Sequence, residues 1–163
     1  MKWTIRQEKT GDETAIAQTI RLAFAGKAYA DGNEERLPEK LRACGALVLS
    51  LVAVERKAVI GHACLSPARI GEEKWLCLGP VSVLPAKQGQ GIGSALVSSA
   101  VGVAKAYGRG GVILLGDPNF YRRLGFQQTQ LITYQGTTSP HLQFFAFGDP
   151  PVGEAGFHPA FDG

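Results

Sequence analysis

A glycine-rich segment is the part of this sequence most suited to chemistry. Residues 88–94 read Gln-Gly-Gln-Gly-Ile-Gly-Ser, after an apolar strand-like stretch and before a helical pattern. Glycine lacks a Cβ, so the backbone there can curl until several N–H groups point inward. The start of the following helix adds free N–H groups and the positive end of its dipole. The segment therefore predicts a site for a phosphate or pyrophosphate.

Two common phosphate-binding patterns do not fit this segment. A kinase-type loop requires a lysine directly after its last glycine, and none follows Gly93. A dinucleotide fingerprint requires a third glycine where Ser94 or Leu96 stands, depending on the frame. A nucleotide-binding protein is therefore disfavoured. The alternative that the glycines only form a tight turn between strand and helix stays open.

The segments before the glycines predict helices followed by an antiparallel meander. Thr10 and Glu13 have the spacing of a capping box, which predicts a first helix to about Ala25. Asn33 can cap a second, short helix that ends at Gly45. Residues 46–54, 59–70 and 75–83 read as strands joined by short charged turns.

The connection after the third of these strands is different. Residues 93–107 have a buried helical stripe, and residues 112–115 form a fresh apolar strand, so a parallel crossover is expected. Residues 117–124 leave room for a short helix. Residues 127–134 and 142–147 predict a final strand pair around a turn at 136–140. The tail from about Gly148, with its prolines, is expected to lack regular structure.

Three segments in this order resemble the GNAT superfamily of N-acetyltransferases. They are the strand residues 79–85, the pattern Gln88-x-x-Gly91-x-Gly93, and Tyr121-x-x-x-Gly125-Phe126. The resemblance implies an α/β (α+β) fold with a mixed, mostly antiparallel central sheet, a splayed strand pair and helices on both faces. It also implies one acetyltransferase domain over residues 1–163, with an irregular tail from about 148.

The same resemblance implies acetyl-coenzyme A as cosubstrate and no metal. Pro80 cannot donate to a strand ladder, so a bulge at Gly79-Pro80 is expected to open backbone groups to which the pantetheine arm can add as a strand. An edge-strand proline without a ligand is the alternative. Lys87 and Arg109 are candidates for the coenzyme phosphates, and the alternative is that each is only a solvated surface charge. The expected coenzyme-binding residues are Val81, Ser82, Val83, Gln88, Gly89, Gln90, Gly91, Ile92, Gly93 and Ser94.

Tyr121 is the candidate catalytic residue, because the resemblance places it at the family's general-acid position. When an amine attacks a thioester, a thiolate leaves. A thiol has a pKa of about 8.5 and a phenol one of about 10, so a positioned tyrosine can protonate the leaving sulfur. The alternative is a packing tyrosine beside Phe120, Leu124 and Phe126.

The base that removes the amine proton is left unassigned by the sequence. Glu34 and Glu35 are candidates, although a solvated helix face explains each of them more simply. Cys77 reads as a core thiol rather than an acyl carrier. His62 reads as a core or cleft histidine rather than a ligand.

Bulk properties limit the remaining choices. The 163 residues predict one domain, with 45% hydrophobic and 19% charged residues, which is typical of a globular core. The net charge of +3 gives no reason to expect nucleic acid, and no apolar stretch has the length of a membrane span or signal peptide. Three cysteines fit reduced thiols, so a cytoplasmic protein, monomer or homodimer, is expected.

The leading hypothesis is an enzyme that transfers an acetyl group from acetyl-coenzyme A to a primary amine by direct attack in a ternary complex. The acceptor is a small molecule or a peptide, and the loops at 25–37 and 134–142 are expected to select it. The alternative is a module that binds acyl-coenzyme A and senses it without turnover.

Overall fold

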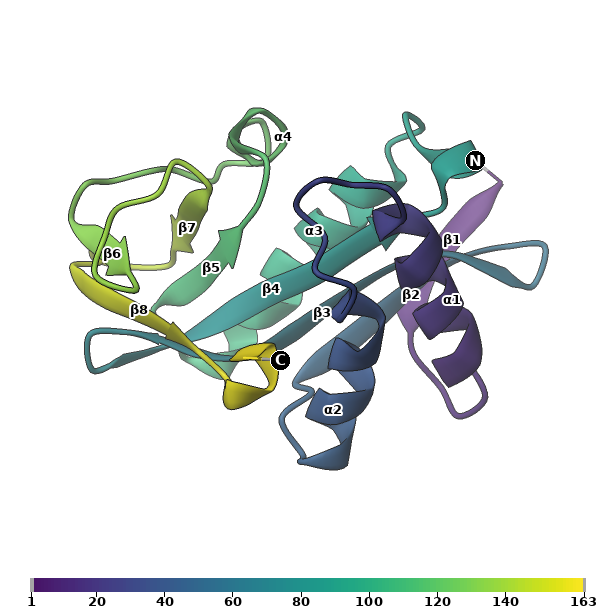
Figure 1. Cartoon of the computed structure of the whole chain (residues 1–163), viewed down its shortest axis with the longest axis horizontal. Helices are drawn as coiled ribbons and strands as arrows, with labels where there is room; N and C mark the ends of the chain where they lie inside the picture. Colours follow the sequence, from purple (N-terminus) through teal and green to yellow (C-terminus); the bar gives the residue numbers. More distant parts are fainter. Residues whose placement is uncertain (1, 163) are drawn as a thin grey trace.

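The computed structural model describes residues 2–162, and its regular elements follow the periodicities of the sequence (Figure 1). The N-terminal half contains β1 (Trp3–Gln7), α1 (Glu13–Phe24), α2 (Leu37–Ala43), β2 (Leu49–Glu55), β3 (Ala58–Ile70) and β4 (Glu73–Val83). The C-terminal half contains α3 (Ile92–Ala104), β5 (Gly111–Leu115), α4 (Pro118–Arg122), β6 (Ile132–Tyr134), β7 (Leu142–Ala146) and β8 (Gly153–Phe157). No helix within the described residues is long and apolar enough to cross a membrane.

One sheet organises the molecule, in the order β1-β2-β3-β4-β5-β7. The pairs along this path are antiparallel except for β4 and β5, which α3 connects as a parallel crossover. The expected mixed, mostly antiparallel sheet is therefore confirmed.

Helices cover both faces of this sheet, as expected. Helices α1 and α2 lie on one face and α3 lies on the other (Figure 1). The main core between the sheet and α3 contains the predicted stripe Leu96, Val97, Ala100, Val101 and Ala104. Gly61 of β3 permits the close approach of α3, because a Cβ there would lie 3.1 Å from the side chains of Ile92 and Leu96.

The predicted irregularity at Gly79-Pro80 is a β-bulge. Ala63 pairs with Val81 and Leu65 pairs with Leu78, so Cys64 of β3 alone opposes the two residues Gly79 and Pro80. The Cys64 thiol donates a hydrogen bond to the Gly79 carbonyl, 3.1 Å away.

Beyond this bulge β4 separates from β5. The two strands pair only at Leu76–Val112 and Cys77–Ile113, although β4 continues to Val83. Within residues 2–162, no strand pairs with this edge of β4 after Cys77. The expected splayed strand pair is therefore present, and it is called the β4–β5 fork below.

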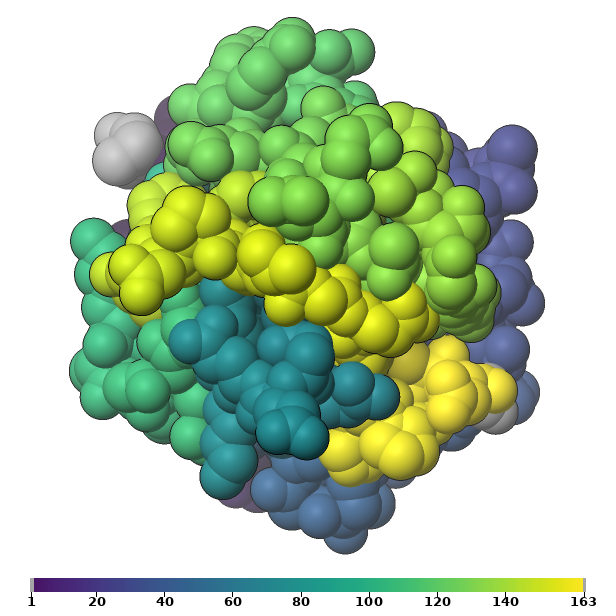
Figure 2. Space-filling view, turned by 90° about the vertical axis from the view of Figure 1, so that its left-hand side faces the viewer, coloured from purple at the N-terminus to yellow at the C-terminus, as the bar shows by residue number. Residues whose placement is uncertain are grey.

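The expectation of an irregular tail from about residue 148 is wrong. Residues 153–157 form β8, which pairs antiparallel with Ala68–Ile70 of β3 and parallel with β6. β2 begins at Leu49, opposite Leu65, so the part of β3 after Leu65 has a free edge that β8 occupies. Figure 2 shows this yellow segment between the teal β3–β4 turn and the green segment that contains β6.

The predicted final strand pair is also wrong in its partners. β6 pairs with β8, whereas β7 pairs with β5 across the whole of that strand. Within residues 2–162, the isolated bridge between residues 127 and 144 is the only backbone pairing between the two expected strands. The sequence pattern predicted both strands, but it did not predict which distant strands they pair with.

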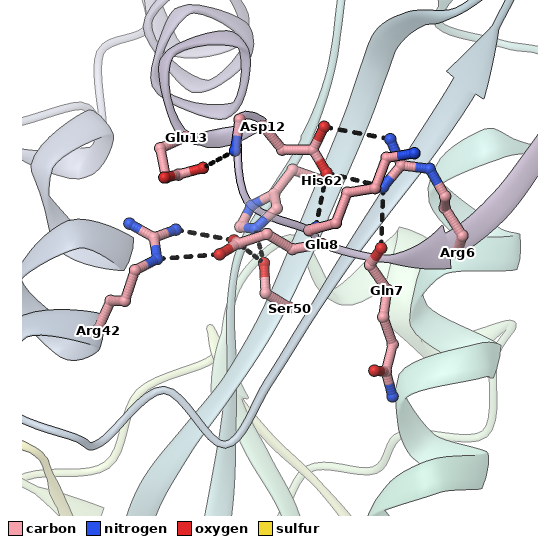
Figure 3. A network of polar contacts seen from close by, with 10 residues as sticks. Arg6, Gln7, Glu8, Asp12, Glu13, Arg42, Ser50 and His62 are labelled. Carbon is pink, nitrogen blue, oxygen red and sulfur yellow. Dashed lines mark hydrogen bonds and ion pairs between the residues drawn. The ribbon is translucent and has the colours of Figure 1, made fainter.

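The capping box at Thr10 does not form, because α1 begins at Glu13 with Asp12 at its N-cap. The acidic side chains instead bind loop amides. Asp12 Oδ2 accepts from the Lys9 N–H at 2.8 Å, and Glu13 Oε1 accepts from the Gly11 N–H at 2.7 Å. Arg6 of β1 donates to both carboxylate oxygens of Asp12, which fixes the start of α1 on the sheet (Figure 3).

A second part of the same polar network fixes α2. Arg42 donates two hydrogen bonds to the Glu8 carboxylate, at 2.9 and 2.7 Å. Glu8 also accepts from the Ser50 hydroxyl, whose oxygen lies 2.8 Å from Nε2 of the buried His62 (Figure 3). These contacts join β1, α2, β2 and β3 on the face that α1 and α2 cover.

The Arg6–Asp12 pair predicts how stability depends on pH. Hydrogen bonds from Arg6 lower the pKa of Asp12 to about 2, against about 3.9 in an unfolded chain. Its ionised form therefore stabilises the fold above about pH 4, and this contribution is lost as the pH falls through 2. Because the Arg6 side chain is 34% exposed, we expect Asp12→Asn to cost about 1–2 kcal/mol at pH 7 and much less at pH 2.

Urea unfolding of the parent and the variant at pH 7, 4 and 2 measures this difference. Asp149→Asn is the matched control, because Asp149 is exposed, and its cost should be near zero throughout. An Asp12→Asn penalty that stays constant down to pH 2 would contradict the assignment.

Candidate active site

The β4–β5 fork opens into a cleft of about 1250 Å³. One part of its lining is β4 from Leu78 to Val83, and another is the glycine segment with the start of α3. A third part is the end of β5 with α4, and the last comes from the two loops expected to select the acceptor. Besides β4, the lining residues are Phe24, Tyr29, Lys87, Gln88, Gly89, Gly91, Ile92, Gly93, Ser94, Leu115, Gly116, Asp117, Phe120, Tyr121, Arg123, Tyr134, Gln135, Thr137, Ser139 and His141.

The glycine segment presents free backbone N–H groups to this cleft. Gly89 and Gly91 have φ values of 79° and 84°, a left-handed conformation that glycine adopts without strain. Gly91 is the N-cap of α3, and no side chain caps the helix. The first intrahelical bond runs from Ala95 N–H to the Gly91 carbonyl, so the amides of residues 92–94 have no intrahelical acceptor. The arrangement suits an anion.

Gln88 holds the glycine segment against the end of β4. Its Nε2 donates to the Val83 carbonyl at 3.1 Å, although the two residues lie five positions apart. Of the ten predicted coenzyme-binding residues, eight line the cleft: Val81, Val83, Gln88, Gly89, Gly91, Ile92, Gly93 and Ser94.

Ser82 and Gln90 are not part of the lining. Side chains alternate along a strand, so Ser82 lies on the opposite face of β4 from Val81 and Val83. It is buried opposite His62 on β3. A role for Ser82 in the cleft is therefore limited to its backbone.

Tyr121 lies in α4 and borders the cleft. Its ring packs edge-to-face against Phe120 and Phe126, with centroids 4.8 and 5.6 Å apart. Burial raises the pKa of the phenol above its ordinary value, so the hydroxyl keeps its proton near neutral pH. No hydrogen bond between described residues uses this hydroxyl. The ring thus has the expected packing role, and its hydroxyl is left available for chemistry.

Two glycines position this ring. A Cβ on Gly116 would lie 2.5 Å from the Tyr121 ring, so only glycine fits there. Gly125 has a φ of 98°, and the turn it makes brings Phe126 back onto Tyr121. This geometry explains the spacing Tyr-x-x-x-Gly-Phe.

His62 and Cys77 are core residues, as the sequence suggested. Burial lowers the pKa of His62 to about 4, so the ring is neutral near pH 7. Burial also raises the pKa of the Cys77 thiol to about 12. Neither side chain lines the cleft.

Several charged candidates have partners outside the cleft. Glu34 accepts from the amides of Asp31 and Gly32, and Glu35 lies 4.0 Å from Arg21. Lys87 borders the cleft but forms an ion pair with Glu55.

Arg109 is not near the expected coenzyme phosphates. It borders a separate hollow of about 340 Å³ with Glu73, Lys74 and Asp149. Its sequence position after α3 places it at the opposite end of that helix from the glycine segment.

The comparisons with known proteins agree with this geometry. A family model described as an acetyltransferase (GNAT) domain matches residues 48–128. A protein named uncharacterized N-acetyltransferase YhbS, from Escherichia coli strain K12, is 34% identical over 126 residues, which is 76% of this chain and 72% of that protein. This chain belongs to the GNAT acetyltransferase family.

Solved structures of related acetyltransferases match the whole fold. A GNAT family acetyltransferase from Brucella melitensis, in complex with acetyl-CoA, is 41% identical, covers 98% of both chains and has a TM-score of 0.86. Escherichia coli YhbS in complex with CoA is 26% identical, covers 100% of this chain and 93% of its own, and has a TM-score of 0.89. The expected enzyme class, an N-acetyltransferase with acetyl-coenzyme A as cosubstrate, is therefore confirmed.

Sequence reasoning missed several lining residues of this acetyltransferase. Asp117 caps α4 by accepting from the Asn119 N–H at 3.0 Å, and Arg123 follows that helix. Tyr29 and His141 lie in the two loops that were expected to select the acceptor. His141 is the only histidine in those loops, and that was the signal available in the sequence.

The three thiols of the acetyltransferase are expected to differ sharply in reactivity. Cys44 is exposed, whereas Cys64 and Cys77 are buried, and burial raises the pKa of both buried thiols. A thiol reagent at pH 8 should therefore label one site in the native protein and three in denaturant. Native Cys44→Ser should take up no label, and rapid labelling of Cys77 in that variant would contradict its burial.

Proposed function

We propose that this acetyltransferase moves the acetyl group from acetyl-coenzyme A to a primary amine by direct attack in a ternary complex inside the cleft. One observation carries the proposal. β4 leaves β5 beside the uncapped start of α3, so an open strand edge and an anion site face the same cleft. The extended pantetheine arm and the pyrophosphate of coenzyme A require these two features together.

The coenzyme contacts follow from these features. The pyrophosphate would accept from backbone amides of residues 89–94, and Arg123 is a nearby cation of the lining. The pantetheine arm would pair with β4 at residues 81–83. Because Gln88 already occupies the Val83 carbonyl, the arm is expected to use the remaining backbone groups of that stretch.

The chemistry requires one proton for the leaving group. The amine nitrogen attacks the acetyl carbon, a C–N bond forms, and the C–S bond of the thioester breaks. Tyr121 donates its proton to the leaving sulfur and is later reprotonated from solvent. Burial favours this role, because the raised pKa of the phenol keeps the proton in place until the sulfur takes on charge.

A panel of primary amines with detection of thiol release tests the function. The panel should include small amines, amino acids, polyamines, aminoglycosides and peptides with free N-termini. We expect at least one amine to accelerate coenzyme A release and to gain an acetyl group. Coenzyme binding without amine-dependent release would instead favour the sensor alternative.

The anion site predicts the effect of a charge in the first turn of α3. Gly93→Asp would place a carboxylate beside the pyrophosphate, and repulsion should weaken coenzyme A binding by at least about tenfold. Gly93→Ala is the matched control. A Cβ at this position would meet Phe120 at 3.4 Å, which is an ordinary contact.

Calorimetry with coenzyme A, together with the thermal shift it induces, measures this effect. If Gly93→Asp, Gly93→Ala and the parent bind coenzyme A with equal affinity, the pyrophosphate does not bind at the start of α3. NADH should raise the melting temperature less than coenzyme A does at matched concentration.

The general-acid role predicts a defect in turnover alone. Tyr121→Phe keeps the ring and its contacts with Phe120 and Phe126, so folding and coenzyme affinity should be unchanged. Loss of a general acid typically costs about 10²–10⁴-fold, and the loss should fall mainly on kcat.

Steady-state kinetics with the best amine of the panel provides the measurement. Tyr107→Phe is the control, because Tyr107 is exposed and lies outside the cleft lining. Turnover by Tyr121→Phe at the parent rate across the pH range would leave Tyr121 with a packing role only.

A further inference from the structure

We propose that His141 is the general base that takes a proton from the ammonium group of the acceptor. This proposal rests on the proposed function, and it supplies the residue that the sequence left unassigned. His141 lies in the loop before β7, borders the cleft and is exposed. A base in this position is open both to the cleft and to the solvent.

Hydrogen bonding fixes which nitrogen of His141 can act as a base. Its Nδ1 lies 3.3 Å from the Gly116 carbonyl oxygen. A carbonyl oxygen only accepts hydrogen bonds, so Nδ1 must carry a hydrogen. In the neutral ring the free lone pair is then on Nε2. The ring is held in the tautomer that leaves Nε2 able to accept a proton.

The backbone around His141 places it next to the proposed acid. Gly116 N–H donates to the His141 carbonyl at 2.9 Å. Gln143 Nε2 donates to the carbonyls of Gly116 and His141, at 3.0 and 3.2 Å. Gly116 in turn packs directly against the ring of Tyr121. One residue therefore contacts both the histidine and the tyrosine, which brings the two groups to the same part of the cleft.

The other titratable groups of the lining are less suited to this role. They are Lys87, Asp117, Arg123, Tyr29, Tyr121 and Tyr134. Lys87 and Arg123 are cations, and an ordinary phenol releases its proton only near pH 10. Asp117 is the one carboxylate of the lining, and it accepts the hydrogen bond that caps α4. An imidazole whose Nδ1 carries the hydrogen has a lone pair on Nε2, so His141 offers a free basic atom at the cleft.

The proton balance of the reaction closes with His141 and Tyr121 together. Nε2 takes one proton from the ammonium, and the neutral amine attacks the acetyl carbon. As the amide forms, its nitrogen loses a second proton to solvent. Tyr121 gives one proton to the sulfur and recovers one from water. The sum is one acetylated amine, one free thiol and one proton released.

The test is the pH dependence of kcat/KM for His141→Asn. The Asn side-chain amide can still donate to the Gly116 carbonyl, so the loop should stay in place, but it cannot accept the proton. For an amine with a pKa of about 10, kcat/KM of the parent should not follow the free-amine fraction between about pH 7 and 10, because the base takes the proton from the bound ammonium. The variant can use only amine that is already neutral in solution, so its kcat/KM should rise about tenfold per pH unit below the pKa of the amine. The defect should reach about 10²-fold or more at pH 7 and nearly vanish at pH 10.

His158→Asn is the matched control. His158 Nδ1 accepts from the Ala160 N–H, and the residue lies outside the cleft lining, so this variant should keep the parent profile. If the pH profile of His141→Asn has the same shape as that of the parent, at full or uniformly reduced activity, His141 is not the general base. That result would leave the acetyltransferase function unaffected. A parent that acetylates no amine of the panel overturns both proposals, so the two failures are distinguishable.

Discussion

The bulge opposite Cys64 is the constraint on which the rest of the site depends. Two residues of β4, Gly79 and Pro80, face one residue of β3, so β4 bends at the point where its pairing with β5 stops. A strand that remained paired on both edges would leave no open backbone for an extended ligand. β3 holds the other edge of β4 on both sides of the bulge, and the fork can therefore open without unravelling the sheet.

The crossover through α3 turns this local distortion into a two-part site. The helix begins at Ile92, after the glycine segment that follows β4, and it leads to β5, so its N-terminus lies at the mouth of the fork. Close packing on Gly61 and the hydrogen bond from Gln88 to Val83 fix that N-terminus relative to β4. On the other face, the contacts of Asp12 with Arg6 and of Arg42 with Glu8 attach α1 and α2 to the sheet. The loop between these helices supplies Tyr29 to the cleft.

The sequence predicted those features that depend on neighbouring residues. The α3 stripe, the glycine segment, the bulge at Pro80 and the Tyr-x-x-x-Gly-Phe spacing are all encoded within a few positions. Features that depend on distant partners were missed or misassigned. β8 has the sequence Gly-Glu-Ala-Gly-Phe, with weak strand propensity, and forms because β3 and β6 offer it free edges. Thr10 and Glu13 were read as a capping box, because nothing local revealed that Arg6 would bind Asp12 and that Asp12 would be the N-cap of α1. His141 could be placed in an acceptor loop, but its contact with Gly116 spans 25 residues.

The different environments of Tyr121 and His141 fit the different tasks proposed for them. An acid that protonates a leaving thiolate must not lose its proton early, and burial among aromatic rings raises the pKa of the phenol. A base must release its proton to water after every turnover, and His141 is exposed at the rim of the same cleft. Gly116 positions both side chains. Because it has no side chain of its own, it packs on the Tyr121 ring, while its carbonyl oxygen lies within hydrogen-bonding distance of the His141 imidazole. Any larger residue at Gly116 would displace Tyr121 and, through the same peptide, the ring that we propose as its partner.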